Sequence, residues 1–354
     1  MFGSRLARLC VYVLALAGGG SLAHFEREQR LHAPAPTVAA QRVREALAPQ
    51  VARAAEVEAP SAPEPTASVR PVPAIAPSEL PIAEREALFR DGMVIDGATP
   101  HRLILFTFDD GPDRRSTPLL LDRLDAAGVK AVFFLTANRI ASRTPMEREH
   151  ATIAREILAR GHIIGNHTLD HLQLPLLDDT GVAQQLGGAE DVFQNVLGIH
   201  PSLLRPPGGA RSPRIDELLA QRGYTTVLWN LSTGDDQVRT AREVFDVWVK
   251  VMERREREDG ERGGIVLLHD TNSWSVDAFQ MIWGELMARN CKLLARGEEL
   301  YDVVPDPSFF YQPRGDAPAG FVAAAAAPDA QVLAERQARL RVDAAQRCAA
   351  IDGF

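Results

Sequence analysis

Short apolar runs alternate with amphipathic segments between about residues 84 and 304 of this 354-residue chain. Apolar runs that lack polar alternation are typical of parallel strands buried on both faces. The first run, residues 103–108, has this pattern and leads directly into two acidic residues. The expected strands are 103–108, 131–135, 162–166, 202–205, 225–229, 265–269 and 292–294.

Amphipathic segments with the spacing of helices fill the intervals between these runs. Strict alternation of strands and helices predicts an α/β fold with a parallel sheet. Seven strands favour closure or near-closure into a (β/α) barrel, with an open doubly wound sheet as the alternative. The expected helices are 117–126, 146–160, 181–197, 213–222, 241–254 and 276–289.

The two ends of the chain differ in composition from this single expected catalytic domain, residues 82–304. Residues 1–23 have a basic start, a short apolar core and a small-residue exit, as in a secretory signal peptide. An uncleaved signal anchor is the alternative, although the apolar core is shorter than the ~20 residues that span a bilayer. The composition of residues 24–81 predicts an Ala/Pro-rich, disordered tether. For residues 305–354 we expect a Pro/Ala-rich tail that contains a terminal docking helix over 329–348.

Charge and cysteine content limit the partners and the compartment. A net charge of −8 without a Lys/Arg patch argues against nucleic acid and suits a neutral or cationic substrate. Cys10 lies in the expected signal, whereas Cys291 and Cys348 either pair in an oxidising compartment or remain thiols. We expect an exported protein of the periplasm, envelope or extracellular space, with membrane contact only through an uncleaved signal anchor.

Chemically capable side chains follow nearly every expected strand. The carboxyl ends of parallel strands meet at one edge of the sheet, where the active sites of α/β folds gather. We therefore expect these side chains to converge. In chain order they are Asp109, Asp110, His167, His171, Arg205, Asp235, Asp236 and His269.

His167, His171 and one of the two neighbouring acids, Asp109 or Asp110, are the expected ligands of one divalent metal ion, with the other carboxylate to spare. The four-residue spacing of the histidines would place both imidazoles on one face of a helical turn. One Asp and two His leave positions open for a water and a substrate carbonyl. Zn²⁺ suits this set best, while Co²⁺, Ni²⁺, Fe²⁺ and Mn²⁺ fit the same ligands.

These segments resemble, in the same order, the motifs of the polysaccharide deacetylases, the chitooligosaccharide-deacetylase-like carbohydrate esterases of family 4. The matching segments are T-F-D-D-G at 107–111, H-T-L-D-H at 167–171, R-P-P at 205–207, the acid Asp235 and L-L-H at 267–269. The resemblance implies a distorted barrel and a hydrolase that acts on carbohydrate polymers.

The resemblance also implies a role for each residue. Asp110 joins His167 and His171 as a metal ligand. Asp109 is the base that takes a proton from a metal-activated water, and Arg205 orients it. His269 is the acid that protonates the leaving amine, and Asp235 favours its imidazolium form. A backbone N–H near Gly208 is expected to stabilise the oxyanion. Leu267 is expected beside the substrate.

Two positions depart from the family pattern. Gly208 and Gly209 stand where the family usually has Tyr, and Asp236 stands where it usually has Trp. Trp229 or Trp274 is the expected replacement for the lost aromatic surface. Asp236 is also the alternative to its neighbour Asp235 as the acid that supports His269.

The leading hypothesis is a metal-dependent hydrolase that removes N-acetyl groups from an amino-sugar polymer such as peptidoglycan or chitin. An O-acetyl esterase or a deacylase of another amide on the same scaffold is one alternative. A non-catalytic wall-binding module is the other.

Overall fold

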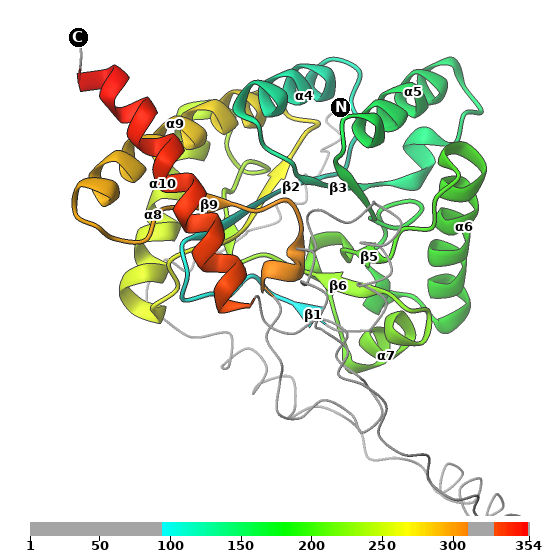
Figure 1. Ribbon diagram of the computed structural model, residues 1–354. Coiled ribbons are helices and arrows are strands. Elements are labelled where there is room, and N and C mark those ends of the chain that lie inside the picture. Colours follow the sequence, from blue (N-terminus) through cyan, green and yellow to red (C-terminus); the bar gives the residue numbers. More distant parts are fainter. Residues whose placement is uncertain (1–93, 311–328, 353–354) are drawn as a thin grey trace, which may run out of the picture. The chain divides into compact units, whose positions relative to one another are not determined.

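The computed structural model describes residues 94–310 and 329–352 (Figure 1). The expected signal peptide, the tether and residues 311–328 of the expected tail lie outside these ranges. No helix within them is long and apolar enough to cross a bilayer.

One sheet organises the fold, and every strand pairing in it is parallel. The pairing order is β1-β6-β5-β4-β3-β2-β8-β7, with β9 on β2. The expected α/β fold with a distorted barrel of parallel strands is confirmed. The strands are β1 Val94–Ile95, β2 Leu103–Asp109, β3 Val132–Leu135, β4 Ile163–Asn166, β5 Leu203–Leu204, β6 Thr225–Val227, β7 Leu231–Ser232, β8 Gly264–His269 and β9 Asp302–Val303.

The link between β6 and β7 shows that the sheet curls almost into a closed barrel. Only residues 228–230 separate these strands, although β6 and β7 lie toward opposite ends of the pairing order. Four Cα steps span at most about 15 Å, so the two edges approach each other. Asn230 ties this link to β8, because its side chain accepts from the Ile265 N–H at 2.9 Å and donates to the Gly263 carbonyl at 3.2 Å.

The side chains of strand β2 belong to two separate parts of the core, because successive side chains of a strand point to opposite faces of the sheet. The even-numbered residues 104–108 lie in the cluster formed with the surrounding helices. Leu103 and Leu105 lie in a second cluster with Phe134 and Ile265, inside the barrel. Two polar residues continue the inner face of β2 toward its carboxyl end. They are Thr107 and Asp109, and both are buried.

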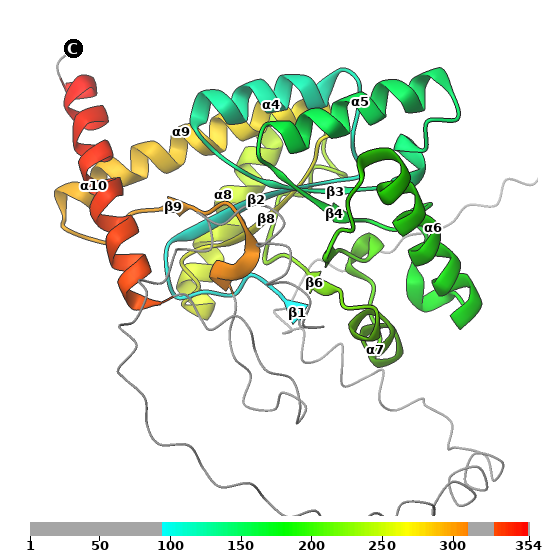
Figure 2. The same cartoon turned by 45° about the vertical axis from the view of Figure 1, so that its right-hand side comes forward.

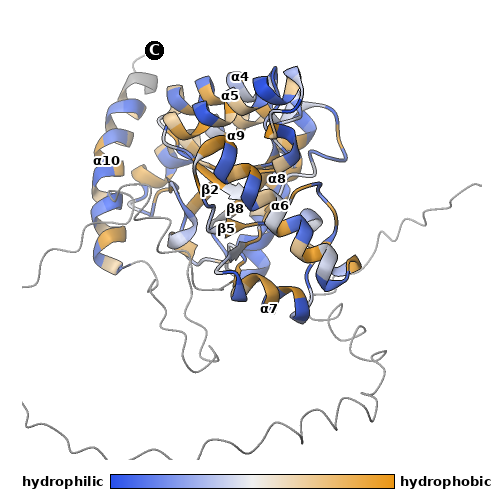
Figure 3. Cartoon of the chain, turned by 90° about the vertical axis from the view of Figure 1, so that its right-hand side faces the viewer, coloured by the Kyte–Doolittle hydropathy of each residue, from blue (hydrophilic) through white to orange (hydrophobic). Residues whose placement is uncertain are grey.

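Six helices cover the sheet, and all six expected helices are confirmed (Figures 1 and 2). Side-chain caps begin α5 to α8: Thr144, Asp178, Ser212 and Thr240 each accept a hydrogen bond from a backbone N–H of the first turn. Apolar and polar residues alternate around α6 and α7, as on amphipathic helices (Figure 3). The bounds are α4 Ser116–Ala127, α5 Pro145–Ala159, α6 Asp179–Leu197, α7 Pro213–Gln221, α8 Ala241–Asp259 and α9 Ser273–Ala295.

Three details of the expected secondary structure are wrong. Residues 292–294 are the last turns of α9 and not a strand, because the buried Leu286, Asn290 and Leu293 continue the helical spacing. The alternation of strands and helices is not strict, since β6 and β7 have no helix between them. The two-residue strands β1, β7 and β9 were not expected, because so short a segment carries no periodic pattern.

The packed region continues beyond residue 304, the expected end of the domain. Pro307–Phe310 forms a 3-10 turn, and Phe309 and Phe310 are buried in the cluster inside the barrel. The expected terminal helix is α10, Ala330–Asp352, which lies beside α9 and β9 (Figure 1). Arg336 joins it to Asp302 of β9 with two hydrogen bonds of 2.6 and 2.8 Å.

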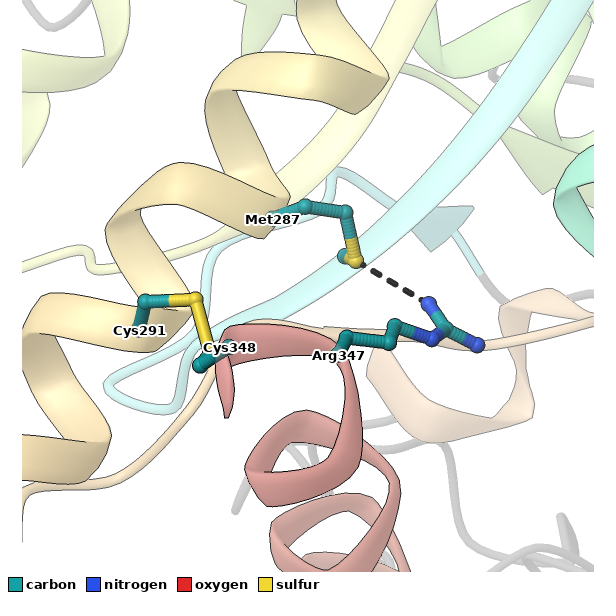
Figure 4. Close-up of a disulfide and its surroundings, with 4 residues drawn as sticks. All are labelled: Met287, Cys291, Arg347 and Cys348. Atoms are coloured by element: carbon teal, nitrogen blue, oxygen red, sulfur yellow. Dashed lines mark hydrogen bonds between the residues drawn. A yellow bond between two sulfur atoms is a disulfide. The ribbon is translucent and has the colours of Figure 1, made fainter. Parts of the chain in front are cut away.

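A disulfide between Cys291 of α9 and Cys348 of α10 fixes the end of α10 (Figure 4). The bond joins residues 57 positions apart in the sequence. One turn away on α9, Met287 accepts a hydrogen bond from Arg347 at 3.3 Å. Of the two states considered for these cysteines, the structure therefore has the paired one.

We expect Cys348→Ser to lower the free energy of unfolding by about 2–4 kcal/mol, because an open loop of this length gains entropy in the unfolded chain. Urea denaturation of the oxidised proteins measures this difference. Under reducing conditions the wild type and the variant should unfold at the same midpoint. A difference that persists after reduction would show that the serine disturbs packing rather than removing a cross-link.

Candidate metal centre and active site

Strand register brings the expected residues to one edge of the sheet. Asp109 at the end of β2 lies level with Phe134 of β3 on one side and with His269 of β8 on the other. On the far side of β3, Asn166 of β4 pairs with Leu204 of β5. The residues that follow these strand ends, including His167 and Arg205, therefore project from the same edge.

Asp109 and Arg205 form a buried ion pair at the centre of this edge. The guanidinium Nη1 lies 2.7 Å from Asp109 Oδ1, and it also donates to the Thr107 hydroxyl at 2.7 Å. Both charged side chains are almost completely buried. Asp109 Oδ2 is not held by this pair and lies 3.8 Å from Nε2 of His167.

The backbone of β6 and the residue after it hold Arg205 in place. Its Nε donates to the Val227 carbonyl at 2.9 Å and its Nη2 to the Leu228 carbonyl at 3.0 Å. The guanidinium carbon lies 4.2 Å from the ring centre of Phe134. With its donors directed to fixed acceptors, Arg205 can hold the Asp109 carboxylate in one orientation.

Asp110, His167 and His171 form a cluster that fits a divalent metal ion. One ligand atom from each lies within 4.8 Å of the others. Asp110 Oδ1 is buried and has no hydrogen-bond partner among the described residues, while the Nε2 atoms of His167 and His171 lie 3.4 and 3.2 Å away. His167 Nδ1 bonds to the Arg205 carbonyl at 2.7 Å, which directs Nε2 toward the cluster as in many metal-binding histidines.

A loop of unusual backbone conformation carries the second histidine. Asp110, Thr168 and His171 are three of the four described non-glycine residues with positive φ, a conformation that the surroundings must enforce. Thr168 stabilises the turn, because its hydroxyl accepts from the His171 N–H at 3.1 Å. The expected helical turn is therefore wrong, since a left-handed loop brings the two imidazoles together.

The metal-binding forms of two of these ligands are favoured at neutral pH. Burial raises the pKa of Asp110, but the neighbouring His167, His171 and His269 outweigh this effect and lower the pKa to about 2. Burial lowers the pKa of His171 from its usual 6.5. An ionised carboxylate and a neutral imidazole are the forms that coordinate metal ions.

His269 and Asp235 form a second charged pair beside the cluster. His269 Nδ1 lies 2.8 Å from Asp235 Oδ1, and Nε2 lies 3.9 Å from Asp110 Oδ2. Burial lowers the pKa of His269, but the hydrogen bond and charge of Asp235 outweigh burial and raise the pKa to about 9. Asp235 also accepts from the hydroxyl of Ser275 at 2.5 Å. Asp236 is exposed and makes no contact of this kind.

A pocket opens beside Asp110 and His269, and the two candidate tryptophans differ in their relation to it. Trp274 lines the pocket together with Asp110 and His269. Trp229 instead packs closely against Gly209. A Cβ atom added to Gly209 would lie only 2.9 Å from the Trp229 indole. The complete lining is Asp110, Asp236, Arg239, His269, Thr271, Asn272 and Trp274.

Gly208 and Leu267 lie at the same edge. Gly208 has a φ of 63° within the turn Pro207–Gly209, a backbone conformation that a tyrosine would rarely adopt. Leu267 is largely buried in β8, and its carbonyl accepts a hydrogen bond from the Thr233 hydroxyl at 2.8 Å. Neither residue lines the pocket.

The sequence motifs explain neither one buried acid nor one pocket residue. The position of Asp270 just before α9 is typical of a helix cap, but the cap position is Asn272, and the Asp270 carboxylate accepts instead from the Thr117 hydroxyl at 2.5 Å. Burial raises the pKa of Asp270 to about 7. Arg239, which lines the pocket, follows Asp235 by four residues but belongs to no motif that would have identified it.

The sequence of this chain is similar to those of known deacetylases. Residues 96–227 match the family described as polysaccharide deacetylase. A peptidoglycan-N-acetylglucosamine deacetylase of Bacillus cereus is 30% identical over 202 residues, which are 56% of this chain and 88% of that protein. A chitin deacetylase of Pestalotiopsis sp is 33% identical over 155 residues, or 44% of this chain, and the match spans only 50% of that enzyme.

The solved structure of the chitin deacetylase from Colletotrichum lindemuthianum has a similar fold. The TM-score is 0.50 at 25% sequence identity, and the match covers 65% of this chain and 95% of that one. The chain belongs to the polysaccharide deacetylase family, which confirms the resemblance inferred from its motifs.

Proposed function

We propose that this protein is a metal-dependent hydrolase that removes N-acetyl groups from an amino-sugar polymer, with peptidoglycan as the favoured substrate. One observation carries the proposal: two charged pairs flank the same candidate metal cluster. One is the buried Asp109 carboxylate with Arg205, and the other is the His269 imidazole with Asp235. A metal site alone would fit many proteins. A base and an acid on either side of it fit amide hydrolysis.

Asp110, His167 and His171 would hold the ion. A divalent ion there supplies Lewis-acid polarisation of the substrate carbonyl and lowers the pKa of a water molecule. The unpartnered Asp110 Oδ1 and the inward Nε2 atoms support this assignment. Zn²⁺ is the favoured ion, because it accepts the mixed nitrogen and oxygen ligands of this cluster.

Asp109 acts as the base. Arg205 occupies its Oδ1, so Oδ2 remains to accept a proton from the attacking water. His269 acts as the acid and gives its Nε2 proton to the amide nitrogen as the C–N bond breaks. Acetate and a free amine on the sugar are the products. Asp235 holds His269 in the protonated form that this step requires.

The proposed location is outside the cytoplasm. The disulfide between Cys291 and Cys348 supports it, because such bonds persist in oxidising compartments. The names of the relatives support it as well, since peptidoglycan and chitin are polymers of cell walls.

Acetate release tests the proposal. The purified protein, loaded with Zn²⁺, is incubated with N-acetylglucosamine oligomers and with peptidoglycan glycan strands, and acetate is measured enzymatically. We expect release from at least one of them, loss of release after dialysis against a chelator, and recovery on adding Zn²⁺. The esterase alternative would be favoured if the metal-loaded protein released acetate from O-acetylated substrates but not from the N-acetyl groups of any amino-sugar polymer.

We expect deacetylation to fall at alkaline pH, because the acid form of His269 is present below its pKa and is lost as the pH rises through about 9. In Asp235→Asn the imidazolium loses its charged partner. The falling limb of the kcat/KM profile should then move to lower pH by about one to two units. An unmoved limb would show that another group titrates there.

A further inference from the structure

The pocket beside His269 contains an arginine that the proposed reaction does not use. Arg239 lies just before α8 and lines the same pocket as Asp110, His269 and Trp274. Its side chain is exposed on the pocket wall and not buried among other residues. A group that reaches Arg239 from within this pocket therefore lies close to the reacting amide.

Three contacts hold Arg239 in a fixed place. Its Nη1 donates to the backbone carbonyls of Asp236 at 2.8 Å and Val238 at 2.7 Å. Its guanidinium carbon lies 5.2 Å from the ring centre of Trp274. Trp274 is itself held, because its indole N–H donates to the Asp235 carbonyl at 2.8 Å. The arginine is therefore preorganised, and holding it requires no charged partner.

Arg239 has no ion-pair partner in the part of the chain that the structure describes. Within residues 94–310 and 329–352, Arg239 forms no salt bridge, and no acceptor is found for its Nε or Nη2. The neighbouring arginine on α8, Arg242, shows the contrast, because it pairs with Asp246 at 3.0 Å. Asp236 lines the pocket too, but only its backbone carbonyl bonds to Arg239.

We propose that Arg239 recognises a carboxylate carried by the polymer near the N-acetyl group that is removed. A planar guanidinium with two free donors binds a carboxylate with two parallel hydrogen bonds. Trp274, which lines the same pocket, adds apolar surface that a sugar ring can contact. This inference rests on the proposed function and adds to it that the favoured substrate is an acidic glycan rather than a neutral one.

The carboxylate has two possible sources in a wall glycan, and separate substrates distinguish them. One is the acid on the lactyl ether of a muramic residue, which is free only when the stem peptide is absent. The other is a carboxylate of the stem peptide itself. Glycan strands without peptides present the lactyl carboxylate, and strands with peptides present the carboxylates of the stem peptide. Methyl esterification of each sample removes the charge of these groups.

The experiment compares kcat/KM for each free-acid glycan with kcat/KM for its methyl ester. We expect the wild type to favour the free acid by about tenfold or more, since a charge-assisted pair is lost in the ester. In Arg239→Gln the ratio should fall to about one, whereas Arg242→Gln, the matched control on α8, should keep the wild-type ratio. A wild-type ratio near one, or an unchanged ratio in Arg239→Gln, would overturn the inference.

A binding measurement separates this inference from the proposed function. Calorimetry with Asp109→Asn, which retains the pocket, compares the affinities for free-acid and esterified glycans, with and without Arg239→Gln. A carboxylate preference that depends on Arg239, without acetate release by the wild type from any glycan, supports the contact and contradicts the proposed reaction. Acetate release without any preference supports the reaction and contradicts the contact.

Discussion

Asp109→Asn is expected to lower kcat for deacetylation by about 10³-fold, within the range of 10²–10⁴ that a general base contributes. The amide keeps the size of the side chain and its contact with Arg205 but cannot accept the proton of the attacking water. The ligands Asp110, His167 and His171 are unchanged, so bound Zn²⁺ should remain near one per chain. Acetate kinetics and elemental analysis of the same samples measure both quantities.

Two comparisons make this result specific. Asp110→Asn should lose affinity for the metal as well as activity, because it removes a ligand charge. Asp122→Asn, at an exposed position on α4, should retain wild-type values for both. If Asp109→Asn keeps more than about a tenth of kcat, Asp109 is not the base. If it loses the metal, Asp109 contributes to the ion site instead.

The second large effect is expected on stability. Arg205→Met should lower the free energy of unfolding by about 3–5 kcal/mol, because it leaves the buried Asp109 carboxylate without its partner. It also removes the donors to Thr107, Val227 and Leu228. Urea denaturation at neutral pH, with and without metal, gives the value.

The double variant Arg205→Met with Asp109→Asn tests the cause. If the uncompensated charge dominates, the double variant should be more stable than Arg205→Met alone. Arg211→Met provides the surface control, because the Arg211–Asp216 pair is partly exposed and should contribute about 1 kcal/mol or less. A cost equal to that of Arg211→Met would show that Arg205 is dispensable for folding.

The sequence allowed much of the sheet to be predicted because its strands are buried on both faces. β2 and β8 are continuous apolar runs, and their register alone places Asp109 beside His269. The short strands β1, β7 and β9 were not predictable, since two residues give no period. Their positions depend on hydrogen bonds to the neighbouring strands of the curled sheet and not on a local sequence pattern.

The site residues were easier to identify than their geometry. A four-residue interval suggested a helical turn for His167 and His171, whereas positive φ at Thr168 and His171 produces the contact. Spacing cannot reveal such a loop, because neighbouring groups, not local preference, impose it. Arg239 was missed for a similar reason: what distinguishes it is that it lines the pocket without an ion pair to any carboxylate of the described residues, which only the fold defines.

The segment after residue 304 has a consequence for how the chain folds during synthesis. Phe309 and Phe310 belong to the cluster inside the barrel, and Cys348 forms the disulfide with Cys291. A ribosome that has completed all the motif residues, up to His269, has therefore not yet supplied the side chains that complete the core. The site is expected to become rigid only after residues far beyond the motifs have emerged from the ribosome.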